Sequence, residues 1–291
     1  MDRRIINRKI DRIAQGKPPR TLDLFAGCGG LSLGFFSAGY NITAAMENDP
    51  FAARSHATNL WKGQPQPIID QHAEPKDIVS NDPAHMTKDL GLGPLEDSFD
   101  VIMGGPPCQA YARVGRPKLR EVFDHPTAFL NDPRGNLYLR FLAYVEELQP
   151  LAILIENVPD VMNIGGHNIS NEICEVLEEL GYTCGYTLLN AAYYGVPQMR
   201  ERMFLIGYAI ELGVKIAFPK PTHWVDLPVG YEGSRNVAMR NLRINGGQRR
   251  NGQTTFIEDD SFFVYPPASC KQLRPAVTAT RREAFRQYNT V

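Results

Sequence analysis

Short apolar runs that alternate with helix-like segments constrain the fold of this chain more than any other feature. Five runs have the length of buried strands, at residues 20–25, 41–46, 99–103, 151–155 and 203–208. Three segments carry apolar residues at helical spacing, at residues 31–38, 136–148 and 169–180. Strands that alternate with helices predict an α/β fold with a doubly wound, mostly parallel sheet. A further short amphipathic helix is expected before the first strand.

The pattern changes near residue 219, after which Pro and Gly interrupt the chain and the periodicity fades. We therefore predict one domain over residues 1–218 and an irregular region over 219–291. Residues 231–291 hold ten Lys or Arg and five Asp or Glu, whereas the whole chain has a net charge of -1. A basic region behind an acidic body is compatible with contacts to phosphates.

The composition indicates where in the cell the protein resides. A hydrophobic content of 43% over 291 residues is enough for a core. No apolar run approaches the ~18 to 20 residues that span a bilayer, and the charged N-terminus lacks the apolar stretch of a signal peptide. The five cysteines lack the short paired spacings of a zinc site or a disulfide framework. We expect a cytoplasmic, nucleoid-associated protein without a metal site.

A glycine-rich turn follows the first predicted strand, in the sequence Asp-Leu-Phe-Ala-Gly-Cys-Gly-Gly at residues 23–30. Ligands of doubly wound sheets bind beyond the carboxyl ends of the strands, and glycines let the backbone approach them closely. Glu47 follows the second strand, where a carboxylate can accept hydrogen bonds from ribose hydroxyls. The pattern indicates a nucleotide-type cofactor, and the absence of Gly-x-Gly-x-x-Gly disfavours a nicotinamide. The alternative is a tight turn followed by a surface glutamate.

Three further motifs follow other predicted strands. Pro-Pro-Cys-Gln at residues 106–109 comes after the strand at 99–103, so that Cys108 would be presented rigidly as a nucleophile. Glu156 follows the strand at 151–155 and brings a carboxylate to the same edge. Arg200 and Arg202 precede the strand at 203–208, and their spacing directs them to one face of an extended segment. Taken singly, each motif has a plainer interpretation as a core cysteine, a cap or a solvated edge.

Together the four motifs resemble the DNA cytosine C5-methyltransferase family, from about residue 20 to residue 208. The family's motifs Asp-Leu-Phe-x-Gly-x-Gly-Gly, Pro-Cys-Gln, Glu-Asn-Val and Gln-x-Arg-x-Arg occur here in order, at residues 23–30, 107–109, 156–158 and 198–202. The resemblance implies a Rossmann-like methyltransferase fold with S-adenosylmethionine as cofactor. It also implies that residues 1–218 are the catalytic domain and that residues 219–291 begin a target-recognition region.

By resemblance, each motif contributes residues to a site. The implied catalytic residues are Cys108, Glu156, Arg200 and Arg202. The implied cofactor-binding residues are Asp23, Phe25, Gly27, Gly29, Gly30, Glu47, Asp77, Ile78, Pro107 and Leu137. The implied substrate-binding residues are Gln109, Arg113, Arg116, Asn157, Val158 and Gln198.

The resemblance implies transfer of a methyl group to C5 of cytosine in double-stranded DNA, by an enzyme of the bacterial restriction-modification or orphan type. Cys108 would add to C6 of a base that is flipped out of the duplex. The family's closing Asn-Ser element has no counterpart here, so we expect a second chain or a further C-terminal segment to complete the domain. Otherwise we expect a monomer.

Three other functions remain open at this point. Some members of the family methylate transfer RNA, although the Gly-, Pro- and Arg-rich segment after residue 219 favours DNA. A catalytically incomplete fragment could bind nucleic acid without reaction, although such a protein has no need of Cys108, Glu156 and Arg202 together. A Rossmann oxidoreductase would leave the Pro-Pro-Cys-Gln motif without a role.

Overall fold

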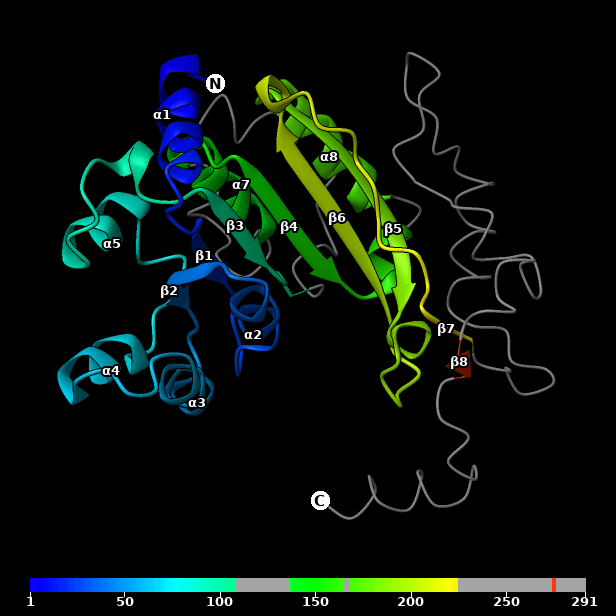
Figure 1. Ribbon diagram of the computed structural model, residues 1–291, viewed down its shortest axis with the longest axis horizontal. Helices are drawn as coiled ribbons and strands as arrows, with labels where there is room; N and C mark the ends of the chain where they lie inside the picture. Colours follow the sequence, from blue (N-terminus) through cyan, green and yellow to red (C-terminus); the bar gives the residue numbers. More distant parts are fainter. Residues whose placement is uncertain (108–136, 165–167, 225–273, 276–291) are drawn as a thin grey trace.

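The computed structural model describes residues 1–107, 137–164, 168–224 and 274–275. Its centre is a six-stranded sheet with the order β2-β1-β3-β4-β6-β5 (Figure 1). Neighbouring strands from β2 to β4 pair in parallel, whereas β6 is antiparallel to both β4 and β5. The strands are β1 (Arg20–Leu24), β2 (Asn41–Met46), β3 (Val101–Gly104), β4 (Ala152–Asn157), β5 (Tyr182–Asn190) and β6 (Glu201–Ala209). The predicted α/β fold with a mostly parallel sheet is thus confirmed.

Helices accompany the strands along the described part of the chain. The α-helices are α1 (Arg3–Ala14), α2 (Gly30–Ser37), α3 (Pro50–Leu60), α4 (Gln66–Ala73), α5 (Pro83–Asp89), α7 (Leu137–Leu148) and α8 (Ile169–Glu179). The short 3-10 helices are η1 (Leu95–Asp97), η4 (Pro159–Met162), η5 (Ala191–Tyr194) and η6 (Ile210–Leu212). Helices α3 and α4 lie side by side near the β2 edge, and α8 lies by β5 (Figure 1). None of the helices described is long and apolar enough to cross a membrane.

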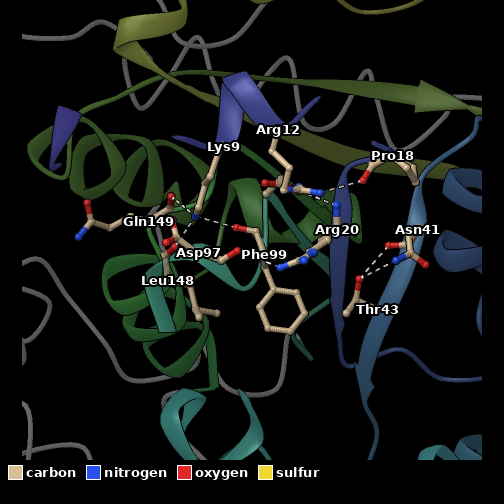
Figure 2. A network of polar contacts seen from close by, with 11 residues as sticks. Lys9, Arg12, Pro18, Arg20, Asn41, Thr43, Asp97, Phe99, Leu148 and Gln149 are labelled. Atoms are coloured by element: carbon tan, nitrogen blue, oxygen red, sulfur yellow. Dashed lines mark hydrogen bonds and ion pairs between the residues drawn. The ribbon is translucent and has the colours of Figure 1, made fainter. Parts of the chain in front are cut away.

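Helix α1 is attached to the sheet by a buried lysine (Figure 2). The ammonium group of Lys9, whose residue is only 1% exposed, donates to three backbone carbonyl oxygens. These acceptors lie at 2.7 to 2.8 Å and belong to Phe99, Leu148 and Gln149. Two of them stand at the C-terminal end of α7, where helix carbonyls have no partner within the helix. Lys9 therefore joins α1, α7 and the segment before β3.

An ion pair reinforces this attachment. Arg12 of α1 pairs with the fully buried carboxylate of Asp100, which also accepts a hydrogen bond from the backbone N–H of Arg20 at 2.6 Å. Burial lowers the pKa of Lys9 to about 8, although the charges of Asp100 and Asp97 act in the opposite direction. The predicted leading helix is therefore present, and both polar residues and isoleucines attach it to the core.

The topology brings the predicted motifs to one edge of the sheet. Strands β1 to β4 end there, and β6 starts there because it runs in the opposite direction. In the antiparallel pair, Asn157 at the end of β4 lies opposite Met203 near the start of β6. The loops that follow four strands and the segment that precedes a fifth thus meet on one side of the apolar core.

The chain after β6 returns toward the same edge. Thr222 donates its backbone N–H to the carbonyl of Tyr193, and the hydroxyl of Tyr194 donates to the carbonyl of Pro219 at 2.8 Å. The short strand β7 (His223–Trp224) then pairs in parallel with β8 (Arg274–Pro275). The domain boundary at residue 219 stays a prediction.

Candidate active site

The glycine-rich turn forms a strained loop between β1 and α2. Phe25 adopts φ 61°, a conformation that is rare for a bulky residue, and Gly27 and Gly29 have φ values of 54° and 94°. The loop is held from β2, because Ala26 donates its N–H to the carbonyl of Met46 at 3.0 Å. Strained backbone of this kind persists where the surroundings hold it, and it gathers at functional sites.

Glu47, directly after β2, supports the loop with its carboxylate. One oxygen accepts the backbone N–H of Gly27 and the other accepts that of Asp49, each at 2.8 Å. The side chain is half-buried. These contacts join Glu47 to the glycine-rich loop, and its role in cofactor binding stays a prediction.

The next predicted cofactor residues lie close to Glu47 along the chain. Lys76 donates its N–H to the carbonyl of Glu47 at 2.7 Å, which places Asp77 and Ile78 beside the end of β2. Asp77 is exposed, whereas the side chain of Ile78 is in the core. Leu137, at the start of α7, is half-buried and packs against the same core. The structure brings these residues to one side, and their roles stay predictions.

The start of the predicted nucleophile loop is held by its neighbours. Gly104 ends β3 so close to β1 that a Cβ atom there would lie 2.1 Å from the carbonyl oxygen of Leu24. The side-chain amide of Asn157 donates to the carbonyl of Pro106 at 2.7 Å. Pro107 is exposed. The rest of the predicted loop lies outside the described residues, including Cys108, Gln109, Arg113 and Arg116.

Glu156 and the two arginines form a charged cluster beside that loop. Nε of Arg202 lies 3.0 Å from Oε1 of Glu156, and Nη2 of Arg200 lies 3.8 Å from the same oxygen. A Cβ atom on Gly105 would lie 3.2 Å from Oε2 of Glu156, so the carboxylate touches the segment that leads to the nucleophile. The cluster joins β4, β6 and the end of β3.

The remaining predicted residues flank this cluster. Val158 is half-buried and donates its backbone N–H to Oδ1 of Asn157 at 2.8 Å. Gln198 is exposed in the turn before β6, and its carbonyl accepts the N–H of Arg200 at 3.1 Å. The turn thus shapes the approach of the arginines to Glu156.

Ser32 and His56 belong to none of the four sequence motifs' predicted site residues, and they lie under the glycine-rich loop. Both side chains are buried, and they form a hydrogen-bonded chain with Asp23. Asp23 is fully buried, so its carboxylate faces these two residues from beneath the loop. The only sequence signal available was a histidine between alanines, because Ala53 and Ala57 are the other buried residues of α3.

The sheet and the loops at its edge define a Rossmann-like α/β chain of the methyltransferase type. A crystal structure of a prophage-encoded E. coli protein, assigned as a DNA modification methyltransferase, matches it with a TM-score of 0.52 and 30% identity. That match covers 68% of this chain and 49% of the other.

A family model for C-5 cytosine-specific DNA methylase matches residues 19–272. The chain belongs to this family. Similar relatives include M.OihORF3336P of Oceanobacillus iheyensis, 40% identical over 71% of this chain and 43% of the relative. The type II methyltransferase M.AquIA of Picosynechococcus is 31% identical over 86% of this chain and 90% of the relative. The chain spans less than half the length of the first relative and of the type II methyltransferase M.AgeI from Thalassovita gelatinovora, but nearly all of M.AquIA.

Proposed function

We propose that this protein transfers a methyl group from S-adenosylmethionine to C5 of cytosine in double-stranded DNA, as a type II methyltransferase of a restriction-modification system. The observation that carries the proposal is the contact between Glu156 and Arg202 at 3.0 Å, beside a loop start that Asn157 holds through Pro106. Membership of the C-5 cytosine-specific DNA methylase family supports the same chemistry.

The loop between β1 and α2 is suited to S-adenosylmethionine. Its strained residue Phe25 has a partly buried ring that packs against the core, and the carboxylate of Glu47 accepts the N–H of Gly27. A Cβ atom on Gly27 would meet nothing within 4 Å, so the missing side chain there leaves open space in which an adenosyl group can approach the backbone. We infer that these residues, with Asp77 and Gly30, hold the cofactor. When bound, S-adenosylmethionine supplies an electrophilic methyl group.

In the proposed reaction, the target base is first flipped out of the duplex. The thiolate of Cys108 forms a bond to C6 while Glu156 delivers a proton to N3, which makes C5 electron-rich. C5 would then form a bond to the methyl carbon while the bond between that carbon and the sulfonium sulfur breaks, which leaves S-adenosylhomocysteine. Loss of the C5 proton to a base, return of the N3 proton to Glu156 and cleavage of the sulfur–C6 bond restore the ring and the thiolate.

The arginines have a separate part in this proposal. Arg202 is placed by its ion pair with Glu156, so its remaining N–H groups are oriented before substrate arrives. They would hold the carbonyl oxygen of the base, where negative charge develops during addition. Arg200 is half-exposed and farther from the carboxylate, and it would contact the base or a phosphate.

We further propose that another segment or a second chain covers part of this domain. Leu33 and Phe36, one turn apart on α2, are 59% and 58% exposed next to the cofactor loop. Phe51 at the start of α3 is 81% exposed. Large apolar side chains this exposed support a surface that another segment or chain covers.

A methyl-transfer assay tests the proposed function. The chain is incubated with S-adenosylmethionine carrying a labelled methyl group and either duplex DNA or transfer RNA, and the products are digested to nucleosides. We expect label in 5-methylcytosine from DNA, and no label with Glu156→Gln. Label in RNA alone would support a transfer RNA methyltransferase instead, and label in neither would contradict both.

A further inference from the structure

Three buried polar side chains lie in a row beneath the loop between β1 and α2. Ser32 Oγ donates to Oδ2 of Asp23 at 2.6 Å, and Nε2 of His56 lies 2.9 Å from the same hydroxyl oxygen. The three residues come from β1, α2 and α3, and each is at most 1% exposed. Oδ1 of Asp23 and Nδ1 of His56 have no partner within the described part of the chain.

The directions of these hydrogen bonds depend on one another. Burial lowers the pKa of His56 to about 4, so the ring is neutral near pH 7. With Asp23 ionised, Ser32 donates to the carboxylate and therefore accepts from Nε2–H of His56. A proton taken up from solvent by Asp23 reverses the chain: Asp23 donates to Ser32, Ser32 donates to Nε2, and the ring proton resides on Nδ1.

Both arrangements are accessible near neutral pH. Burial raises the pKa of Asp23 to about 7, the charge of Glu47 adds to this effect, and the hydrogen bonds from Ser32 oppose it. Glu47 also faces His56 and raises its pKa, and His72 on α4 is the other titratable group coupled to this ring. Among the described residues, Glu47 directly after β2 and His72 on α4 are the charged or titratable groups coupled to the row.

The row is in direct contact with the cofactor loop. A Cβ atom on Gly29 would lie only 2.7 Å from Cδ2 of His56, so the ring forms the floor under this glycine. Ser32 is in the first turn of α2, which starts at Gly30. A change in the row therefore acts on the backbone that carries Gly29 and Gly30.

We propose that Asp23, Ser32 and His56 are a positioning relay for the cofactor loop, and that the direction of its hydrogen bonds sets the affinity for S-adenosylmethionine. This inference rests on the proposed function. The ionised arrangement places a negative charge beneath a loop that would receive a cationic sulfonium, so it is the binding-competent one. The relay residues act through the loop and not by touching the methyl group.

The expected effect follows from the fraction of ionised Asp23. With a pKa of about 7, this fraction is about a tenth at pH 6 and about nine-tenths at pH 8. An apparent dissociation constant scales inversely with the competent fraction. The affinity for S-adenosylmethionine should therefore rise up to about tenfold between pH 6 and pH 8.

Calorimetric titration of the full chain with S-adenosylmethionine, repeated from pH 6 to pH 8, measures this stepwise rise in affinity. Asp23→Asn should remove it, and the curve of this variant corrects for titration of the cofactor itself. Ser32→Ala should move the step to higher pH, because the bond that lowers the pKa of Asp23 is lost. Ser98→Ala is the matched control, since Ser98 is fully buried and bonds to the carbonyl of Pro94 outside the site. It should keep the wild-type step.

The relay would be overturned if the wild-type affinity rose between pH 6 and pH 8 by less than twofold more than the affinity of Asp23→Asn. A second measurement needs no cofactor. Nitrogen-15 NMR spectra of the free chain report which ring nitrogen of each histidine carries the proton, and the His56 signals are assigned by their loss in His56→Phe. The ring proton should move between the two nitrogens with a midpoint near pH 7 in the wild-type chain but not in Asp23→Asn. Ring signals that stay constant from pH 6 to pH 8 would reject the relay.

Failure of all variants to bind S-adenosylmethionine would reject the proposed function, while the ring signals would still decide the relay.

Discussion

Replacement of Gly29 by alanine tests how tightly the cofactor loop is packed. The substitution has two costs that the structure separates. Alanine at φ 94° is in the left-handed region, which costs about 1–2 kcal/mol. Its Cβ would also lie 2.7 Å from the buried ring of His56, which cannot retreat easily because Nε2 is bonded to Ser32. Overpacking of this kind costs about 1–3 kcal/mol, so we expect a total loss of about 2–5 kcal/mol.

Gly39 provides a matched control. Its φ of 89° is nearly the same, but nothing lies within 4 Å of a Cβ atom at this position. Gly39→Ala should therefore lose only the backbone cost of about 1–2 kcal/mol. Urea unfolding followed by circular dichroism gives both free energies of unfolding.

A double-mutant cycle then identifies the source of the difference. Replacing His56 by alanine removes the ring that the new methyl group meets. The double variant with Gly29→Ala should be more stable than the sum of the single effects, by about 1–3 kcal/mol. Equal losses for Gly29→Ala and Gly39→Ala, with no coupling to His56, would refute the close contact.

Three further changes test other parts of the structure. Lys9→Met should lower the free energy of unfolding, measured in urea, by about 3–5 kcal/mol, because three carbonyl oxygens lose their donor. The control is Lys17→Met on the exposed surface, which should change this free energy by less than about 0.5 kcal/mol. The pKa of His56 is lowered from 6.5 to about 4, so its contribution is complete above pH 6.5 and is lost as the pH falls to 4. The stability difference between wild type and His56→Phe should shrink by up to about 3 kcal/mol over this range, and a constant difference would contradict the lowered pKa. Asn157→Ala should slow single-turnover methylation about 10- to 100-fold, because the nucleophile loop loses its hydrogen bond at Pro106. The affinity for S-adenosylmethionine should stay within about twofold. An unchanged rate would contradict the role of Asn157 in holding the loop.

Much of the sheet could be predicted from apolar runs, and the exceptions have physical reasons. The predicted strand at residues 41–46 coincides with β2, and that at 203–208 lies within β6. Strand β5 was missed, although Tyr182, Cys184, Tyr186 and Leu188 alternate along it and are buried. Its intervening threonines and glycine weakened the pattern. Periodicity also carries no information on direction, so the reversal of β6 could not be anticipated.

The candidate site, like the sheet, could be predicted from the sequence only in part. Glu156 and Arg202 were predicted to share a site because both motifs match one family, and the structure pairs them. The contact between Ser32 and His56 could not be predicted, since the two residues are 24 positions apart on separate helices and no spacing rule relates them. Their contact arises only when α2 and α3 fold over β1. The roles of Cys108 and the loop after it stay predictions, because these residues lie outside the described part of the chain.

Covalent trapping tests the central claim most directly, namely that this chain methylates cytosine in DNA through Cys108. Duplex DNA containing 5-fluorocytosine is incubated with the chain and S-adenosylmethionine, then denatured and resolved by electrophoresis. Fluorine at C5 cannot leave as a proton, so the bond between sulfur and C6 cannot be released after methyl transfer. We expect an adduct of protein and DNA that survives denaturation, requires S-adenosylmethionine and disappears in Cys108→Ser. An adduct that persists in Cys108→Ser, or no adduct with the wild-type chain, would contradict the account.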